Sequence, residues 1–364
     1  MAIPRPQLGG HSRRHLRRAL SIVGAALMVG IVTLVFRTLS AGGSFVTVNP
    51  GYSGRCALTA RLAVRDIAID ARSGLAFLAV AAVRANAADG IYLADPAHPE
   101  RPPLRLPGVP PGFHPDALSL WRDQAGGLVL FAASPGPGSG SVDAFSVQLG
   151  AHPALTETAD IGSSLFAHVR AVAAVDANRF YAIDAPPVGD DFFSLLLSYL
   201  TPAHGRIIFY DGEIPHIVAK GLRAPRGLAL SADGSRLYVG LSLSRTLASY
   251  SVEPFLGHLT AAGTYPLPLA PAHLSRAGGT SLLVAGDPKL FARATFAKDP
   301  SQPSPSAVVR VHFEGDAPHG VTQIYADMGH GIAAADVAVE AGRRLLIGSA
   351  LDDRLLSCTP AEGR

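Results

Sequence analysis

The distribution of apolar and polar residues along the chain predicts a series of β-hairpins. In "APRGLALSADGSRLYVG", Ala224–Gly240, the apolar segments 228–230 and 237–239 flank an Ala-Asp-Gly turn. Short apolar segments on both sides of such a turn are typical of two half-buried strands joined as a hairpin. A single hairpin cannot bury its own apolar face, so the pattern predicts that similar units recur along the chain.

Five other segments repeat this order of apolar strand, polar turn and apolar strand, and most are followed by one or two further apolar segments. Six positions are equivalent in the repeat: Arg65, Asp116, Arg170, Arg226, His273 and Asp336. The intervals between them are 51, 54, 56, 47 and 63 residues, which is the spacing of propeller blades. We therefore predict an all-β fold, a six-bladed β-propeller of four-stranded blades. A β-sandwich or a two-domain β protein is the competing architecture, and the near-equal spacing argues against both.

The sequence also predicts how the ring of blades closes. The last unit lacks an outer strand, and residues 56–62 can supply it beside residues 353–358. Cys56 and Cys358 are the only cysteines, and a bridge between them would join the first strand to the last. A disulfide is the expected use of two cysteines in an exported domain, and two buried free thiols are the alternative. The propeller is predicted to span residues 56–358, followed by a tail at 359–364.

The N-terminus predicts a membrane-associated segment. Residues 1–18 contain five arginines, and residues 19–36, "ALSIVGAALMVGIVTLVF", carry no charge. Eighteen uncharged residues are barely long enough to span a bilayer, and the basic flank orients the N-terminus toward the cytoplasm. We expect a cytoplasmic segment at 1–18, a transmembrane helix or signal anchor at 19–36 and a linker at 37–55. A cleaved signal peptide and a buried core helix are the alternatives.

Composition narrows the classes of function. The chain has 364 residues, of which 48% are hydrophobic and 16% charged, and this composition is typical of a folded protein. The formal net charge is only +3 and many arginines lie in the N-terminal segment, so we expect no nucleic-acid partner. The sequence also contains no Cys/His cluster with zinc spacing, no nucleophile elbow and no phosphate-binding loop.

Four blade motifs carry a resemblance to a known family. They are "RDIAID" with "SGLAF" from Arg65, "FHPDALSL" from Phe113, "APRGLALSADGSRLYV" from Ala224 and "LLIGSALDDRLLSC" from Leu345. In this order they resemble the paraoxonase/arylesterase family, which is related to gluconolactonase-like and strictosidine-synthase-like propellers. The resemblance covers residues 63–358. It implies hydrolysis of lactones or aryl esters, a calcium ion in the central channel, an N-to-C disulfide that the two cysteines match, and often a retained N-terminal anchor.

The resemblance also implies calcium ligands that this chain lacks. The ligand positions of the catalytic calcium correspond here to Arg65, Arg170, Arg226, Ala272 and His273. At the structural calcium site Asp66 is the one side-chain match, and the other ligand positions correspond to Leu118 and Ala171. The proposed general base of the family and its supporting histidine correspond to Asp116 and Ser134. Calcium needs six to eight oxygen ligands and a guanidinium supplies none, so we expect neither calcium nor another cofactor.

Three interpretations of the arginines remain open. Arg–Asp pairs across the channel, with Asp116 and Asp336, would plug a redundant pore. Alternatively, Arg65, Arg170 and Arg226, with Asp336, form a pocket for a small anionic ligand or partner in a degenerate, metal-independent member of the family. The third interpretation is an active esterase or lactonase without metal, in which His273 or Asp116 is the base and the arginines stabilise an oxyanion.

One apolar stretch falls in a loop of the third unit, "DDFFSLLLSYL" at Asp190–Leu200. The resemblance implies a helix at the channel mouth that contacts lipid, and a helix packed on its own blade is the alternative. Together with the N-terminal segment, this stretch predicts a single-pass protein of the bacterial inner membrane. Its propeller would face the periplasm or the exterior.

Overall fold

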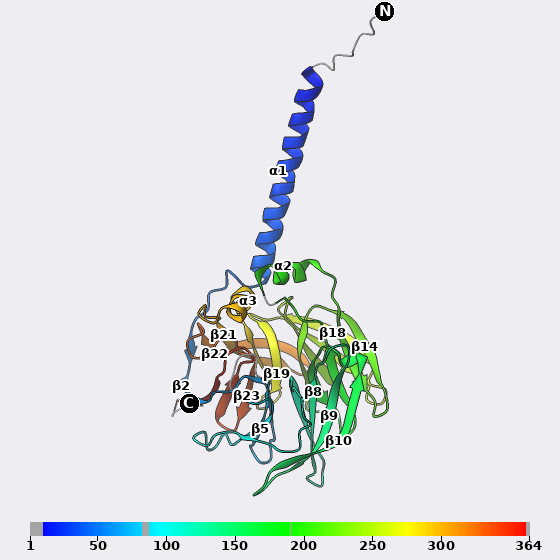
Figure 1. Cartoon of the computed structure of the whole chain (residues 1–364), viewed down its shortest axis with the longest axis vertical. Helices are drawn as coiled ribbons and strands as arrows, with labels where there is room; N and C mark the ends of the chain where they lie inside the picture. The colour runs from blue at the N-terminus through cyan, green and yellow to red at the C-terminus, as the bar shows by residue number, and fades with distance from the viewer. Residues whose placement is uncertain (1–9, 82–86, 190, 362–364) are drawn as a thin grey trace, which may run out of the picture.

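Six β-sheets are arranged radially in the computed structural model, which describes residues 10–81, 87–189 and 191–361 (Figure 1). The predicted six-bladed propeller is therefore confirmed. Blade one contains β3 (Val64–Ile69), β4 (Ala76–Val80), β5 (Gly90–Ala94) and β6 (Leu104–Arg105). Blade two contains β7 (Ala117–Arg122), β8 (Leu128–Ser134), β9 (Gly140–Gln148) and β10 (Ala154–Ser163). Blade three contains β11 (Val169–Ala174), β12 (Phe180–Asp184), β13 (Gly205–Tyr210) and β14 (Pro215–Leu222).

The other three blades follow the same order, from an innermost strand to an outermost one. Blade four contains β15 (Pro225–Leu230), β16 (Arg236–Leu241), β17 (Thr246–Val252) and β18 (Leu259–Pro266). Blade five contains β19 (Ala270–Arg276), β20 (Leu282–Asp287), β21 (Ser306–Glu314) and β22 (Ala317–Asp327), and β1 (Gly51–Tyr52) extends its outer edge. Blade six contains β23 (Val337–Ala341), β24 (Arg344–Gly348), β25 (Leu355–Pro360) and β2 (Gly54–Ala60).

The hydrophobic core lies between the blades. Each innermost strand contacts the innermost strands of both neighbouring blades. In the layer between blades three and four, for example, Tyr181 and Phe209 pack with Leu237 and Val239, and all four are almost fully buried. Because strand residues alternate between the two faces of a sheet, each blade is apolar on both faces and needs a neighbour on each side.

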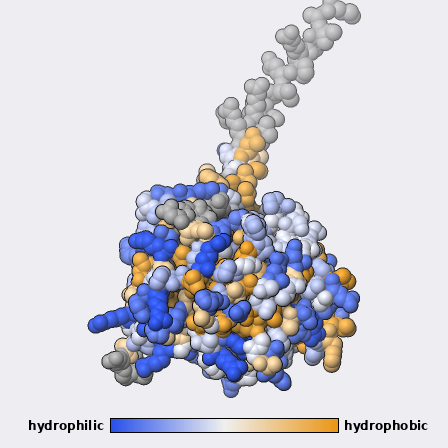
Figure 2. Space-filling model, turned by 60° about the horizontal axis from the view of Figure 1, so that its bottom comes forward, coloured by the Kyte–Doolittle hydropathy of each residue, from blue (hydrophilic) through white to orange (hydrophobic). Residues whose placement is uncertain are grey.

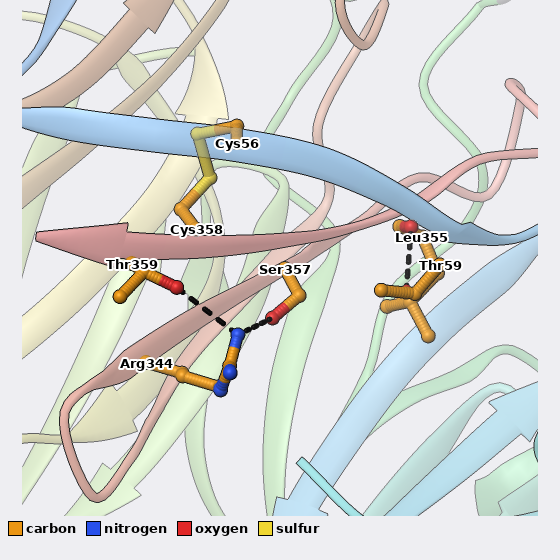
Figure 3. The surroundings of a disulfide bond; sticks show 7 residues. All are labelled: Cys56, Thr59, Arg344, Leu355, Ser357, Cys358 and Thr359. Atoms are coloured by element: carbon orange, nitrogen blue, oxygen red, sulfur yellow. Dashed lines mark hydrogen bonds between the residues drawn. A yellow bond between two sulfur atoms is a disulfide. The ribbon is translucent and has the colours of Figure 1, made fainter. Parts of the chain in front are cut away.

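The ring closes between β2 and β25, as the sequence predicts. The two strands are antiparallel with Cys56 opposite Cys358, and the cysteines form a disulfide across 302 residues (Figure 3). Thr59 Oγ1 donates a hydrogen bond to the Leu355 carbonyl at 3.0 Å, which ties the other end of the pair (Figure 3). The first strand of the propeller is therefore held to its last by backbone pairing, a side-chain hydrogen bond and a covalent bond.

Helix α1 (Gly10–Ala41) projects from one face of the propeller (Figure 1). Its segment Arg18–Ala41 contains an exposed stretch of 18 residues with a mean hydropathy of 2.5. The segment is therefore long and apolar enough to cross a membrane. Figure 2 shows apolar side chains along α1 next to the propeller. Within the segment predicted as a linker, residues 37–55, the helix continues to Ala41 and β1 pairs with β22.

Two short helices, α2 (Phe192–Leu200) and α3 (Leu290–Lys298), cover the face of the propeller where α1 joins (Figure 1). The helix predicted in the loop of blade three is α2; Asp190, at the start of the predicted stretch, lies outside the described residues. Asp191 caps the helix by accepting hydrogen bonds from the backbone N–H groups of Phe193 and Ser194. A 3-10 turn (Ser164–Phe166) leads from blade two into blade three.

Loss of the disulfide should destabilise the fold, because the bond closes a loop of 302 residues and so lowers the conformational entropy of the unfolded chain. We expect Cys358→Ser to lower the free energy of unfolding by about 4 kcal/mol and Tm by roughly 10 °C. Thermal unfolding followed by circular dichroism under oxidising conditions measures this difference. Reduced wild-type protein is the control and should unfold at the temperature of the variant; equal Tm values for oxidised wild type and variant would contradict the prediction.

Candidate functional site

Five of the six equivalent positions of the repeat lie at the beginning of the innermost strands, and His273 lies in the middle of β19 (Ala270–Arg276). Arg65, Arg170 and Arg226 are the second residues of β3, β11 and β15, and Asp116 and Asp336 directly precede β7 and β23. In β3, β11 and β15 the pairing with the next strand is interrupted by a β-bulge at the arginine. A bulge leaves its extra residue outside the ladder and redirects the side chain. The bulges therefore explain how arginines from three blades reach the same channel.

The first ion cluster joins blades one, two and three. Arg65 Nη1 lies 2.6 Å from Asp116 Oδ1, and Arg170 Nη1 lies 3.6 Å from Asp116 Oδ2. Arg65 Nε also donates a hydrogen bond to the Ala81 carbonyl at 3.2 Å. Asp116 is only 6% exposed. Two guanidinium groups thus share one buried carboxylate, and both of its oxygens face positive charge.

The second ion cluster joins blades four and six to α3. Arg226 Nη2 lies 2.7 Å from Asp336 Oδ1, and Arg293 Nη2 lies 3.2 Å from the same oxygen. The Ala350 N–H donates to Asp336 Oδ2 at 2.7 Å. Burial alone would raise the pKa of Asp336, but Arg293, Arg226 and this N–H outweigh it and hold the pKa well below its usual range. Asp336 therefore stays ionised between two cations.

Arg293 is the site residue that sequence analysis missed. It comes from α3, a helix inserted between the second and third strands of blade five, so it lies outside the six equivalent positions of the repeat. Its Nε lies 3.6 Å from Asp287 Oδ2. Among the described residues, Arg293 Nη1 and both carboxylate oxygens of Asp287 make no hydrogen bond, although all are buried. Burial raises the pKa of Asp287 to about 6 although Arg293 favours its ionised form.

His273 contacts a carboxylate of blade one. Its Nδ1 lies 3.4 Å from Asp66 Oδ1, and its backbone N–H donates to the Asp336 carbonyl oxygen at 3.0 Å. Asp66 also accepts hydrogen bonds from the backbone N–H groups of Ile67 and Leu118, each at 2.8 Å. Burial raises the pKa of Asp66 even so. His273 and Ala272 lie within the bulge between β19 and β20, so this blade also redirects its side chain at the equivalent position.

Two cavities approach these clusters from opposite ends of the innermost strands. The helix-side cavity, of about 170 Å³, is lined by Arg170, Arg226 and Arg293 together with residues of α2 and α3. The far-side cavity, of about 880 Å³, is lined by Asp66 and His273 and by the later residues of the innermost strands. The two ion clusters lie between them. Among the described residues, no group of three or more His, Cys, Asp or Glu side chains is placed to hold a metal ion.

Comparison with known proteins agrees with this fold and with the sequence motifs. The chain is 26% identical over 247 residues to serum paraoxonase/arylesterase 2 of Rattus norvegicus, covering 68% of each protein. The human paraoxonase/arylesterase 2 is 25% identical over the same length and coverage. A regucalcin from Agrobacterium tumefaciens, described as a calcium-binding protein, has a TM-score of 0.53 at 12% identity, over 87% of this chain and 98% of that one.

A luciferin-regenerating enzyme has a TM-score of 0.53 at 11% identity, over 85% of this chain and 96% of that one. At such identities the two solved structures show a shared fold alone. The family model for Arylesterase matches residues 66–359, which include most of the propeller but neither Arg65 nor strand β2. The resemblance inferred from the blade motifs is confirmed: the chain belongs to the arylesterase family.

Proposed function

We propose that this protein is a membrane-anchored propeller whose central channel binds a small anion through arginine side chains, without calcium. One observation carries the proposal: Arg226 and Arg293 share the single carboxylate of Asp336 and also line the helix-side cavity. Across the two ion clusters, four guanidinium groups face the carboxylates of Asp116, Asp287 and Asp336, which leaves one positive charge that a bound anion would balance. Guanidinium groups bind carboxylate and phosphate through paired, charge-assisted hydrogen bonds.

The chemistry of the donors argues against calcium in the channel. Calcium takes six to eight oxygen ligands, whereas Arg65, Arg170 and Arg226 offer only N–H groups at the positions that correspond to its ligands. At an effective dielectric constant of about 20, each guanidinium about 5 Å from Ca²⁺ would cost roughly 7 kcal/mol. The carboxylates of Asp116 and Asp336 are already in contact with guanidinium groups. The residues present therefore do not fit the ion.

We place the protein in the inner membrane of a bacterium, with the propeller on the periplasmic or exterior side. The exposed apolar segment of α1 supports the anchor, and the arginines that precede it favour a cytoplasmic N-terminus. The Cys56–Cys358 disulfide fits an oxidising compartment. On α2, beside α1, Phe193 is 73% exposed and Leu197 is 57% exposed, which supports a second contact with lipid.

Metal-independent ester or lactone hydrolysis is the second candidate function. The contact between His273 Nδ1 and Asp66 favours it, because a carboxylate that holds the Nδ1 proton leaves Nε2 as a base. Both residues line the far-side cavity, from which water can reach them. In this function the guanidinium groups of the ion clusters would stabilise an oxyanion.

We expect benzoate and inorganic phosphate to raise Tm of the wild-type protein by several degrees at saturation. Arg226→Asn should weaken this binding at least tenfold because it removes one charge-assisted donor. Arg236→Asn is the matched control, since Arg236 pairs with Asp316 at 3.0 Å outside the channel. Neither calcium nor a chelator should change Tm. Micromolar calcium affinity of the wild-type protein would contradict the metal-independent proposal.

The shared carboxylates predict unequal costs for the two partners of one ion pair. Asp336→Asn removes the ion-pair partner of Arg226 and leaves Arg293 with Asp287 alone, so we expect it to lower the free energy of unfolding by about 3 to 5 kcal/mol. Arg226→Asn should cost only about 1 kcal/mol, because Arg293 and the Ala350 N–H still hold Asp336. Asp316→Asn, at an exposed pair, is the control and should change stability by less than about 1 kcal/mol. Equal costs for the two channel variants, measured by denaturant unfolding, would argue against sharing.

Hydrolysis can be tested separately. If the second function holds, the wild-type protein should hydrolyse phenyl acetate or a lactone at a rate that a chelator does not change. His273→Gln should reduce kcat at least a hundredfold, because the base is lost, and should leave benzoate binding unchanged. His312→Gln is the matched control, because His312 is exposed near the end of β21, the third strand of blade five, away from the channel. Turnover that needs calcium, or that survives His273→Gln, would contradict this assignment.

A further inference from the structure

The lining of the helix-side cavity is divided between charge and apolar surface. Its charged residues are Arg170, Arg226 and Arg293. Its apolar walls come from α2, α3 and the loops of blades three and four: Val188, Leu195, Leu243, Leu290, Ala294 and Ala297. An inorganic anion would use only the charged part and would leave this apolar surface uncovered. A ligand with an anionic end and a hydrocarbon part matches both parts of the lining.

Helix α3 presents both kinds of surface to the cavity on a single face. Leu290, Arg293, Ala294 and Ala297 all line the cavity, and they follow the spacing i, i+3, i+4, i+7. A carboxylate bound by Arg293 therefore has small apolar side chains directly beside it, one turn farther along the helix. Two alanines at this point keep the space next to the guanidinium free of bulky groups.

The cavity lies next to the point where α1 joins the propeller. Leu39, near the end of α1, packs against the cluster that contains Leu195, Leu290 and Ala294. The Leu290 N–H donates to the Gly42 carbonyl at 2.9 Å, so the chain that leaves α1 is hydrogen-bonded to the first residue of α3. If α1 crosses the bilayer, these contacts place α2 and α3 at the membrane surface.

We propose that the anion is an amphipathic carboxylate drawn from the bilayer. Its carboxylate binds Arg226 and Arg293, and its hydrocarbon chain lies against Leu290, Ala294 and Ala297. A cavity of about 170 Å³ has room for the carboxylate and a short length of chain, so a longer chain extends past the helices. This inference rests on the proposed anion-binding function and on the membrane anchor, and it adds the class of ligand and the route by which it arrives.

Binding of acetate, butyrate, hexanoate and octanoate to the detergent-solubilised full chain tests the inference. Each methylene that enters the apolar part should increase affinity three- to fourfold, until the chain leaves the cavity. Ala297→Phe should fill the apolar part and reduce hexanoate affinity at least tenfold more than acetate affinity. Ala292→Phe is the matched control, because Ala292 has similar partial exposure on the same helix but does not line the cavity.

The outcomes separate this inference from the function on which it rests. Equal affinities along the series, or equal effects of Ala297→Phe and Ala292→Phe, would overturn the amphipathic ligand while anion binding stands. If no carboxylate binds, including acetate, the proposed function itself fails.

The route from the bilayer is tested with the full chain in lipid nanodiscs. A photoreactive long-chain carboxylic acid should label peptides of α2 and α3, and the alcohol of the same chain length should label them at least fivefold less. Arg226→Asn should reduce labelling by the acid to the level of the alcohol. Equal labelling by acid and alcohol in the wild-type protein would overturn recognition of a membrane-borne carboxylate.

Discussion

The pairing of buried charges across the channel is the constraint on which the arrangement of blades depends. Four buried aspartates meet four partly buried arginines there: Asp66, Asp116, Asp287, Asp336, Arg65, Arg170, Arg226 and Arg293. An unpaired buried charge is costly, and each blade supplies only part of a cluster. The pairs therefore exist only while the blades stand in a closed ring, so the strand pairing at the disulfide and the charges at the centre stabilise the same arrangement.

The repeat, the closure and the resemblance could be predicted from sequence because each rests on local patterns that recur. The bulges at Arg65, Arg170 and Arg226 agree with the equivalence drawn from the repeated pattern of strand, turn and strand. Arg293 could not be found in this way, because α3 is an insertion and its contact with Asp336 depends on where the helix packs. Strand β1 was missed as well, since two residues that pair with a distant edge carry no periodicity.

The ion-pair and pocket interpretations of the arginines turn out to be compatible. Each of Asp116 and Asp336 contacts two guanidinium groups, so the ring is held together without a ligand. The same sharing leaves donor capacity at Arg293, whose Nη1 has no hydrogen-bond partner among the residues described. Asp287 changes the net charge of this cluster with pH, because a buried carboxyl with a pKa of about 6 is partly protonated in mildly acidic solution. One set of side chains can therefore stabilise the fold and still attract an anion.

On the proposal that arginines take the place of calcium, the chemistry of the channel changes in kind. A calcium ion polarises oxygen atoms from any direction and dissociates when it is scarce, whereas a guanidinium is covalently attached and stays charged at every physiological pH. Its N–H groups lie in one plane and form paired hydrogen bonds with a planar carboxylate. Such a site favours an acid that is already ionised over a neutral ester carbonyl. For this reason the arrangement of Arg226 and Arg293 supports binding of an anion more directly than it supports hydrolysis.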